Sequence, residues 1–196
     1  MILRSVLLAA MLQFAFSASA RADDGFASSF AQAVRTSTAA YRLVVWARAN
    51  QYMQSSDYVA GLGTMFMSGD RFDPKDLAHP SMLVYDEAGR LVACGYQFRP
   101  GVSTPHDFDS VPASAWYQIP SHVHYNVRVD GQMHFGQAPW ESSDAPTFEN
   151  LRKRNLIPAN GRLENSLVHP ATRAIMVWAW LPNDAGLFAG ENSQLP

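Results

Sequence analysis

The sequence contains very little cysteine, with Cys94 alone among 196 residues. A single cysteine excludes a disulfide within the chain. Stability must therefore come from packing, a bound metal or assembly. The surrounding run, LVACGYQF, is apolar, so we expect Cys94 to be a buried thiol rather than a metal ligand.

Basic charge is also scarce. The chain has 15 basic and 17 acidic residues, and its longest basic run is Arg152-Lys153-Arg154. Without a basic patch, a nucleic acid is not an expected partner. The sequence also lacks a Gly-x-Ser-x-Gly elbow, which would present a catalytic serine, and a glycine-rich phosphate loop.

Long hydrophobic runs are missing beyond the first residues. MILR supplies a positive start, VLLAAMLQFAF is apolar, and small residues follow, which is the pattern of a secretory signal peptide. The run of about 11 residues is shorter than the roughly 20 needed to cross a bilayer. We expect residues 1–22 to be removed, leaving a single domain, residues 23–196, in the periplasm or outside the cell, with no membrane span. This removal takes away Arg4 and Arg21 and no acidic residue, so the formal charge changes from −2 to −4.

The hydrophobic periodicity changes along the chain. Between Asp24 and Gln54, apolar residues recur at spacings of three and four, which predicts one long helix or two with a bend near Ser55-Ser56. Residues 99–120 hold four prolines and predict a long irregular segment. Strands are predicted at 61–67, 81–86, 90–98, 122–129 and 173–180, with a hairpin at 87–89 and a short helix at 147–157. The predicted class is α+β: a long N-terminal helix on a mostly antiparallel sheet of about five strands that could be barrel-like.

Histidines are concentrated in one segment. Three of the six lie in SHVHYNVRVDGQMHFGQ, residues 121–137. His122 and His124 alternate with valine and tyrosine, so on a strand they point to the same side, about 7 Å apart. Neutral imidazole is a good ligand for zinc and copper. The apolar row must face the core, which leaves the histidines facing water, a groove or a lumen.

The place of His134 depends on the turn. Asp130-Gly131 is a strong signal for a two-residue hairpin, which would put His134 opposite Val127 and on its face. A wider loop would instead bring His134 opposite His124. We retain His122, His124 and His134 as the predicted ligands of a zinc or copper ion. The next candidates for the third ligand are Met65 or Met176, and then His106.

Five separate stretches occur in an order that resembles a family of secreted, uncharacterised bacterial proteins. That family has an Ala-Thr-x-x-Tyr helix, a Gly-Met-Gly-x-His-Tyr element and a terminal His-x-Trp-x-Trp strand followed by Asn-Pro-x-Gly-x-Phe. The resemblance implies architecture and compartment, and no reaction. The stretches are VRTSTAAY (34–41), GLGTMF (61–66), HPSMLVYDEAGRLVACGYQF (79–98), HFGQ (134–137) and IMVWAWLPNDAGLFAGENSQLP (175–196).

This chain departs from that pattern where the family has two histidines. Met65 and Met176 occupy those positions. If the family's histidines are ligands, two thioethers replace them here, and thioethers favour Cu(I) over zinc. The alternative is that both methionines fill gaps in the core.

The histidine pattern has two shorter resemblances, each over fewer than about 20 residues. His-x-His followed by a third histidine resembles the zinc pattern of acetolactate decarboxylases, and Pro-x-His-x-His resembles an element of intradiol dioxygenases. The tyrosine and carboxylate ligands of those families have no counterpart here. A cupin would need a glutamate soon after the second histidine, where Val129 and Asp130 stand.

Three functions remain open from the sequence. The first is an exported protein that binds or handles a transition metal ion. The second is a metal-dependent enzyme, a lyase or oxygenase acting on a small organic acid, with the same histidines. The third is a module that binds a small molecule or a partner protein without metal.

Overall fold

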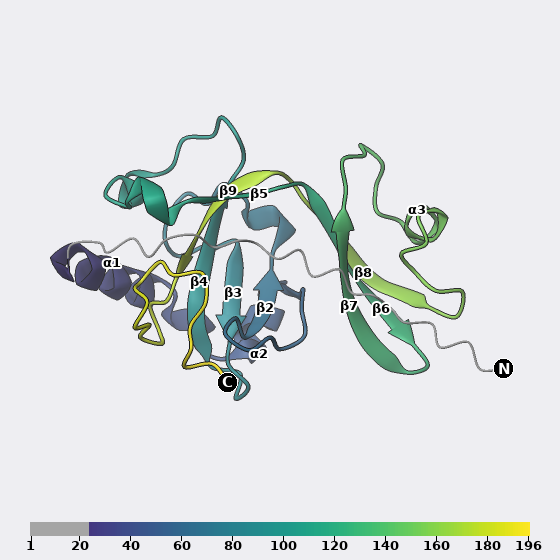
Figure 1. Cartoon of the computed structure of the whole chain (residues 1–196), viewed down its shortest axis with the longest axis horizontal. Coiled ribbons are helices and arrows are strands. Elements are labelled where there is room, and N and C mark those ends of the chain that lie inside the picture. The colour runs from purple at the N-terminus through teal and green to yellow at the C-terminus, as the bar shows by residue number, and fades with distance from the viewer. Residues whose placement is uncertain (1–23) are drawn as a thin grey trace.

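The computed structural model describes residues 24–196, and the predicted signal peptide lies outside them. Helices and antiparallel strands combine, so the α+β class is confirmed (Figure 1). The predicted single sheet of about five strands is wrong. Within residues 24–196, nine strands form a six-stranded sheet, ordered β1-β2-β3-β4-β9-β5, and a three-stranded sheet, ordered β7-β6-β8. Neither sheet closes into a barrel among the described residues.

The strands and helices have the following bounds. The six-stranded sheet, hereafter the large sheet, contains β1 Met53–Gln54, β2 Thr64–Met67, β3 Met82–Tyr85, β4 Leu91–Phe98, β5 Tyr117–Ile119 and β9 Thr172–Val177. The three-stranded sheet, the small sheet, contains β6 His122–Val129, β7 Gln132–Pro139 and β8 Arg162–His169. The α-helices are α1 Asp24–Ser37, α2 Val44–Ala49 and α3 Phe148–Lys153. Short 3-10 helices lie at η1 Ala39–Tyr41, η2 Gly69–Arg71, η3 His106–Phe108 and η4 Ala113–Ala115.

The predicted long N-terminal helix is broken well before Ser55-Ser56. α1 ends at Ser37, and Leu43 adopts an extended backbone that pairs with Arg90. The backbone N–H of Val44 donates to the carbonyl of Gly89 at 2.9 Å. This segment therefore forms hydrogen bonds to the β3–β4 hairpin instead of continuing the helix. Its β-branched valines have low helix propensity, so little stability is lost by leaving the helical conformation.

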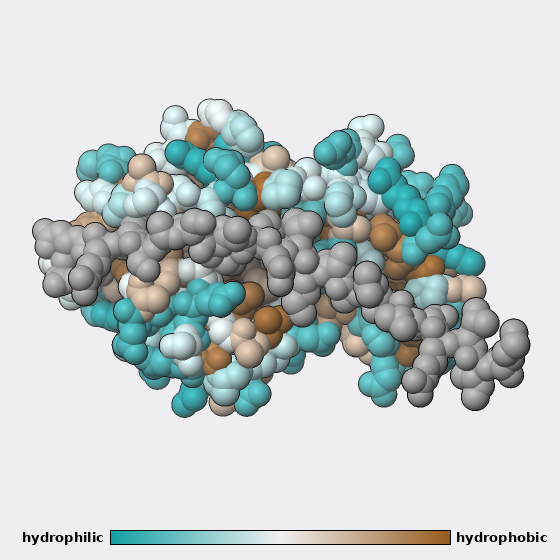
Figure 2. Space-filling view, viewed as in Figure 1, coloured by the Kyte–Doolittle hydropathy of each residue, from teal (hydrophilic) through white to brown (hydrophobic). Residues whose placement is uncertain are grey.

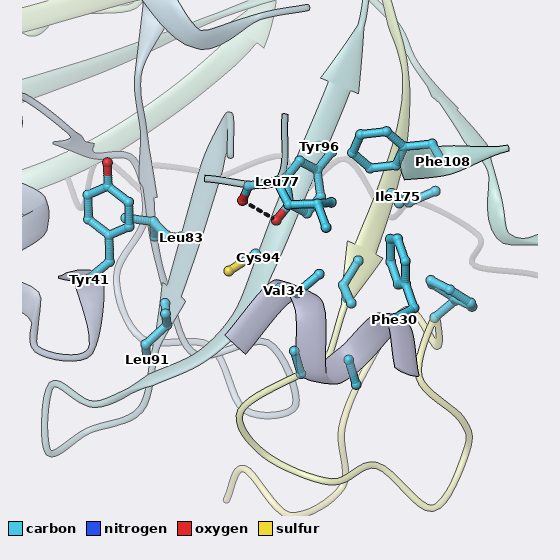
Figure 3. Packing of buried hydrophobic residues seen from close by; sticks show 14 of the residues in the cluster. Phe30, Val34, Tyr41, Leu77, Leu83, Leu91, Cys94, Tyr96, Phe108 and Ile175 are labelled. Atoms are coloured by element: carbon cyan, nitrogen blue, oxygen red, sulfur yellow. Dashed lines mark hydrogen bonds between the residues drawn. The ribbon is translucent and has the colours of Figure 1, made fainter. Parts of the chain in front are cut away.

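One face of the large sheet packs against α1. Phe30 and Val34 of the helix meet Cys94 and Tyr96 of β4 (Figure 3). The Tyr96 hydroxyl donates to the carbonyl of Leu77 at 2.8 Å. Cys94 has no exposed surface, and burial raises the pKa of its thiol to about 12. The prediction of a buried thiol is confirmed.

The other face of the large sheet carries methionines. Met67, Met82 and Met176 are buried there, and Met65 packs against them. Leu167 of β8 joins the same hydrophobic cluster, so the small sheet rests on this face. Flexible thioether side chains are suited to filling the irregular space between two sheets.

The small sheet has a hydrophobic core of its own. Val123, Tyr125 and Val127 of β6 pack with Trp140 and with Leu151 of α3. The chain passes from β5 to β6 through residues 120–121, and from β8 to β9 through residues 170–171. Figure 1 shows both passages joining the two sheets. On the face seen in Figure 2, hydrophilic residues predominate and hydrophobic ones form small separate groups.

Candidate functional site

The β6–β7 hairpin places His134 away from the other two predicted ligands. Asp130 and Gly131 have φ of 49° and 84°, which makes a tight two-residue turn. Val127 therefore pairs with His134, and directly opposite residues share a face. His134 is exposed on the Val127 side. The structure does not bring it together with His122 and His124.

A different histidine joins them from the other edge of β6. His169, at the end of β8, pairs directly with His122. The rings of His122 and His169 stack with centroids 4.3 Å apart and planes 19° apart. The ring of His124 lies 4.6 Å from that of His122 and 6.1 Å from that of His169. We call His122, His124 and His169 the histidine cluster.

The histidine cluster is buried between the two sheets. Its members are 4%, 6% and 1% exposed, which excludes a solvated strand face. The edge of the Phe72 ring meets the His169 ring at 5.0 Å. Farther along β6, the Asn126 amide donates to the carbonyl of Gln54 at 2.8 Å. The polar row of β6 thus faces the large sheet near β1.

Two prolines at the passages between the sheets orient two of the rings. Nδ1 of His122 lies 2.8 Å from the carbonyl oxygen of Pro120, and Nδ1 of His169 lies 2.7 Å from that of Pro170. A carbonyl can only accept, so each Nδ1 carries the proton and each Nε2 keeps its lone pair. This is the tautomer in which metal-binding histidines are usually held by a backbone carbonyl.

The other ring nitrogens of the histidine cluster form few hydrogen bonds. Nε2 of His122 and Nε2 of His124 are 2.9 Å apart. Nε2 of His122 carries no proton, so it must accept this hydrogen bond. His124 therefore donates from a protonated Nε2, and its Nδ1 carries no proton. Nδ1 of His124 and Nε2 of His169 are both buried without a hydrogen-bond partner. The cluster therefore makes one internal hydrogen bond and leaves two lone pairs unused.

All three imidazoles are held neutral. Burial lowers the pKa of His122, and burial with two neighbouring histidines lowers that of His124 well below its usual value. The Ser55 backbone beside the His124 ring opposes that shift without cancelling it. Burial, reinforced by His122, lowers the pKa of His169 to about 3. Neutral imidazole is the form that binds metal.

The other predicted ligands do not come together. Met65 of β2 and Met176 of β9 are on the same face of the large sheet. However, β3 and β4 lie between their strands, a separation of roughly 14 Å at 4.7–4.9 Å per strand. They cannot both bind one ion. His106 is almost fully exposed in η3, where it pairs with Asp109.

Comparison with known proteins gives no relative. No family model matches the chain, and no curated protein or solved structure is significantly similar to it. The resemblance to a secreted bacterial family stays a prediction. Within residues 24–196, no three or more His, Cys, Asp or Glu side chains are already arranged to hold a metal ion. No helix in that range is long and apolar enough to cross a membrane.

Sequence reasoning missed His169, which is followed by Pro170 and was not among the predicted ligands. Gly161 and Pro170 bound the segment 162–169, which can mark the ends of a strand. Apolar and polar residues do not alternate regularly along RLENSLVH, so periodicity gives no strand signal there.

Proposed function

We propose that this chain is an exported protein that binds a zinc or copper ion through His122, His124 and His169. The observation that carries the proposal is the pair of bare imidazole nitrogens in the buried cluster. Leaving a buried polar atom without a partner costs about 1–3 kcal/mol. A cation that accepts the Nε2 lone pair of His169 would remove that cost there, and moving the His124 proton from Nε2 to Nδ1 would free a second lone pair for the same ion.

The donor set suits such an ion. His122 and His169 already have their Nδ1 protons on proline carbonyls, so both offer Nε2. His124 would need to move its proton from Nε2 to Nδ1, next to the Ser55 backbone that neighbours its ring. Three imidazoles are suitable ligands for zinc and for Cu(II).

Only a small movement is required for two of the donors. Nε2 of His122 and of His124 are 2.9 Å apart. Two nitrogens on a tetrahedral zinc stand about 3.3 Å apart, given Zn–N distances of about 2.0–2.1 Å. The rings must therefore separate by a few tenths of an ångström and also turn, because their Nε2 atoms now point at each other rather than at a shared ion, and this movement breaks the hydrogen bond between them.

The test is elemental analysis followed by competition titration. Protein purified from its own periplasm, without a chelating column, should carry about one zinc or copper ion per chain. His122→Gln and His169→Gln should each weaken zinc binding by more than the roughly 10- to 100-fold typical of outer-shell changes. Circular dichroism of the metal-free variants establishes that they are folded.

The matched controls are His134→Gln and His106→Gln, which remove exposed imidazoles outside the cluster. Both should bind zinc as the parent does. Binding that survives His169→Gln but fails in His134→Gln would contradict the proposed ligand set. A parent protein that binds neither zinc nor copper would remove the metal function altogether.

Export has a separate test. The motivation is the signal-peptide pattern in residues 1–22. Amino-terminal sequencing of the mature protein should begin at Asp23 or Arg21. A soluble protein that retains Met1 would refute export and would leave the metal proposal to be judged in another compartment.

A further inference from the structure

A second site lies near the end of β4, away from the histidine cluster. A pocket of about 380 Å³ is formed there by the turn at residues 99–103 together with Gln118 of β5 and Arg173 of β9. Two of its lining residues are arginines, Arg99 and Arg173. We propose that this pocket binds a small organic anion through a carboxylate.

Arg173 supplies the uncompensated positive charge. It pairs with Phe98 of β4 on one side and with Gln118 of β5 on the other, so the three residues share one face. Its guanidinium lies 4.9 Å from the centre of the Trp116 ring, and that ring packs against Phe98 at 5.8 Å. Within residues 24–196, Arg173 forms no ion pair with a carboxylate. The aromatic stack therefore positions the guanidinium while leaving its charge available.

Arg99 is held in place by a buried carboxylate. Its Nε and Nη2 atoms lie 2.6 Å and 2.5 Å from Oδ2 of Asp73, and its backbone N–H donates to Oδ1 at 2.7 Å. Asp73 is buried and has φ of 57°, a conformation that costs energy in a residue other than glycine. Asp73 neutralises the charge of Arg99 but leaves Nη1 outside the pair. Arg99 thus contributes a hydrogen-bond donor to the pocket lining rather than net charge.

Two more polar side chains line the pocket, beside the apolar Pro100 and Val102. Gln118 offers an amide and Ser103 offers a hydroxyl. The turn at residues 99–102 is closed by a hydrogen bond from Val102 N–H to the Arg99 carbonyl. Gly101 completes that turn with φ of 82°. A planar guanidinium fork matches a carboxylate in two parallel hydrogen bonds. The chain has a net negative charge, but the positive charge in this pocket would attract and stabilise an anion.

The pocket is independent of the proposed metal function. Successive residues of a strand point to opposite faces. Arg173 therefore shares its face of β9 with Ile175, which packs on the α1 side, whereas Met176 faces the side where the small sheet rests. The two sites lie on opposite faces of the large sheet, so either can exist without the other.

The test uses succinate as the probe and side-chain NMR as the readout. Saturable shifts of the Arg173 Nε and Trp116 Nε1 signals are expected on titration of the metal-free full chain at constant ionic strength. Arg173→Gln should weaken succinate binding by about 10- to 100-fold, the range for hydrogen bonds to charged groups. Gln118→Ala, at an exposed position, should weaken it several-fold and serves if Arg173→Gln does not fold.

Arg128→Gln is the matched control, because it removes the same charge from the small sheet, where Arg128 pairs with Glu164. It should bind succinate as the parent does. Succinamide, which lacks the carboxylates, should produce no shift. No saturable shift, equal binding by the parent and both pocket variants, or a shift with inorganic phosphate but none with succinate would overturn the proposal.

Discussion

Replacing His169 by glutamine should flatten the dependence of stability on pH. The pKa of His169 is lowered from 6.5 to about 3 in the folded protein by burial. Its folded pKa lies below its unfolded value, so the unfolded state binds the proton more readily as the pH falls. The stability linked to neutral His169 is complete above about pH 6.5 and is lost as the pH falls towards 3. Glutamine does not titrate, so the variant lacks this loss.

The magnitude follows from the two pKa values. At pH 5 the unfolded histidine is mostly protonated and the folded one is not, which lowers the free energy of unfolding by about 2 kcal/mol relative to pH 7. With an m-value of about 2 kcal/mol/M in urea, the midpoint of the parent should fall by roughly 1 M more than that of the variant. Burial also lowers the pKa of His122 and His124, so the total acid loss of the parent should be larger.

The assay is urea unfolding at pH 7, 6 and 5 in the presence of a chelator, which keeps bound metal from adding stability. Carboxylates titrate in both proteins and cancel in the difference. His134→Gln, which removes an exposed imidazole, should keep the slope of the parent. If the parent and His169→Gln lose equal stability between pH 7 and 5, His169 is not held neutral by burial and the reasoning is wrong.

Two further changes test the packing of the small sheet. Gly136→Ala would place a Cβ 2.3 Å from Cζ of Tyr125, so the ring must move and the free energy of unfolding should fall by about 1–3 kcal/mol in urea. An unchanged midpoint would show that Tyr125 has room to move. Thr147→Ala removes the cap of α3, where the threonine hydroxyl accepts from Asn150 N–H at 3.2 Å, and should cost about 1 kcal/mol. Thermal unfolding of Thr147→Ala and Thr147→Ser separates the cap from other effects, because serine should retain most of the stability.

Short-range features of the fold were predictable from the sequence. The β3–β4 hairpin follows from Gly89, and the tight β6–β7 hairpin follows from Asp130-Gly131, because such turns are specified by the residues within them. The two-residue turn at Asp130-Gly131 also predicted that His134 would lie on the Val127 face, away from His122 and His124. The pairing of β8 with β6 joins residues about forty apart in the chain, and no local pattern specifies which strand a distant strand will pair with.

The missed break after α1 and the missed ligand candidate share a physical origin. Leu43 and Val44 lie inside the segment predicted to be helical, but their backbone pairs with the hairpin at Gly89 and Arg90. His169 has a neighbouring proline, which is common in loops, but the proline carbonyl here orients the ring. In both places the local sequence is compatible with two conformations of similar stability, and contacts with distant residues determine which one forms.

The position of Cys94 has a practical consequence for following motion in this protein. Its thiol is sealed in the core of the large sheet, so an alkylating reagent can reach it only when that core opens. The rate of alkylation in the unmodified chain therefore measures opening of the large sheet without an introduced label. The hydrophobic cluster of the small sheet contains no cysteine, and its opening can be followed by amide hydrogen exchange. Comparing the two rates would tell whether the sheets unfold as one cooperative unit or as two.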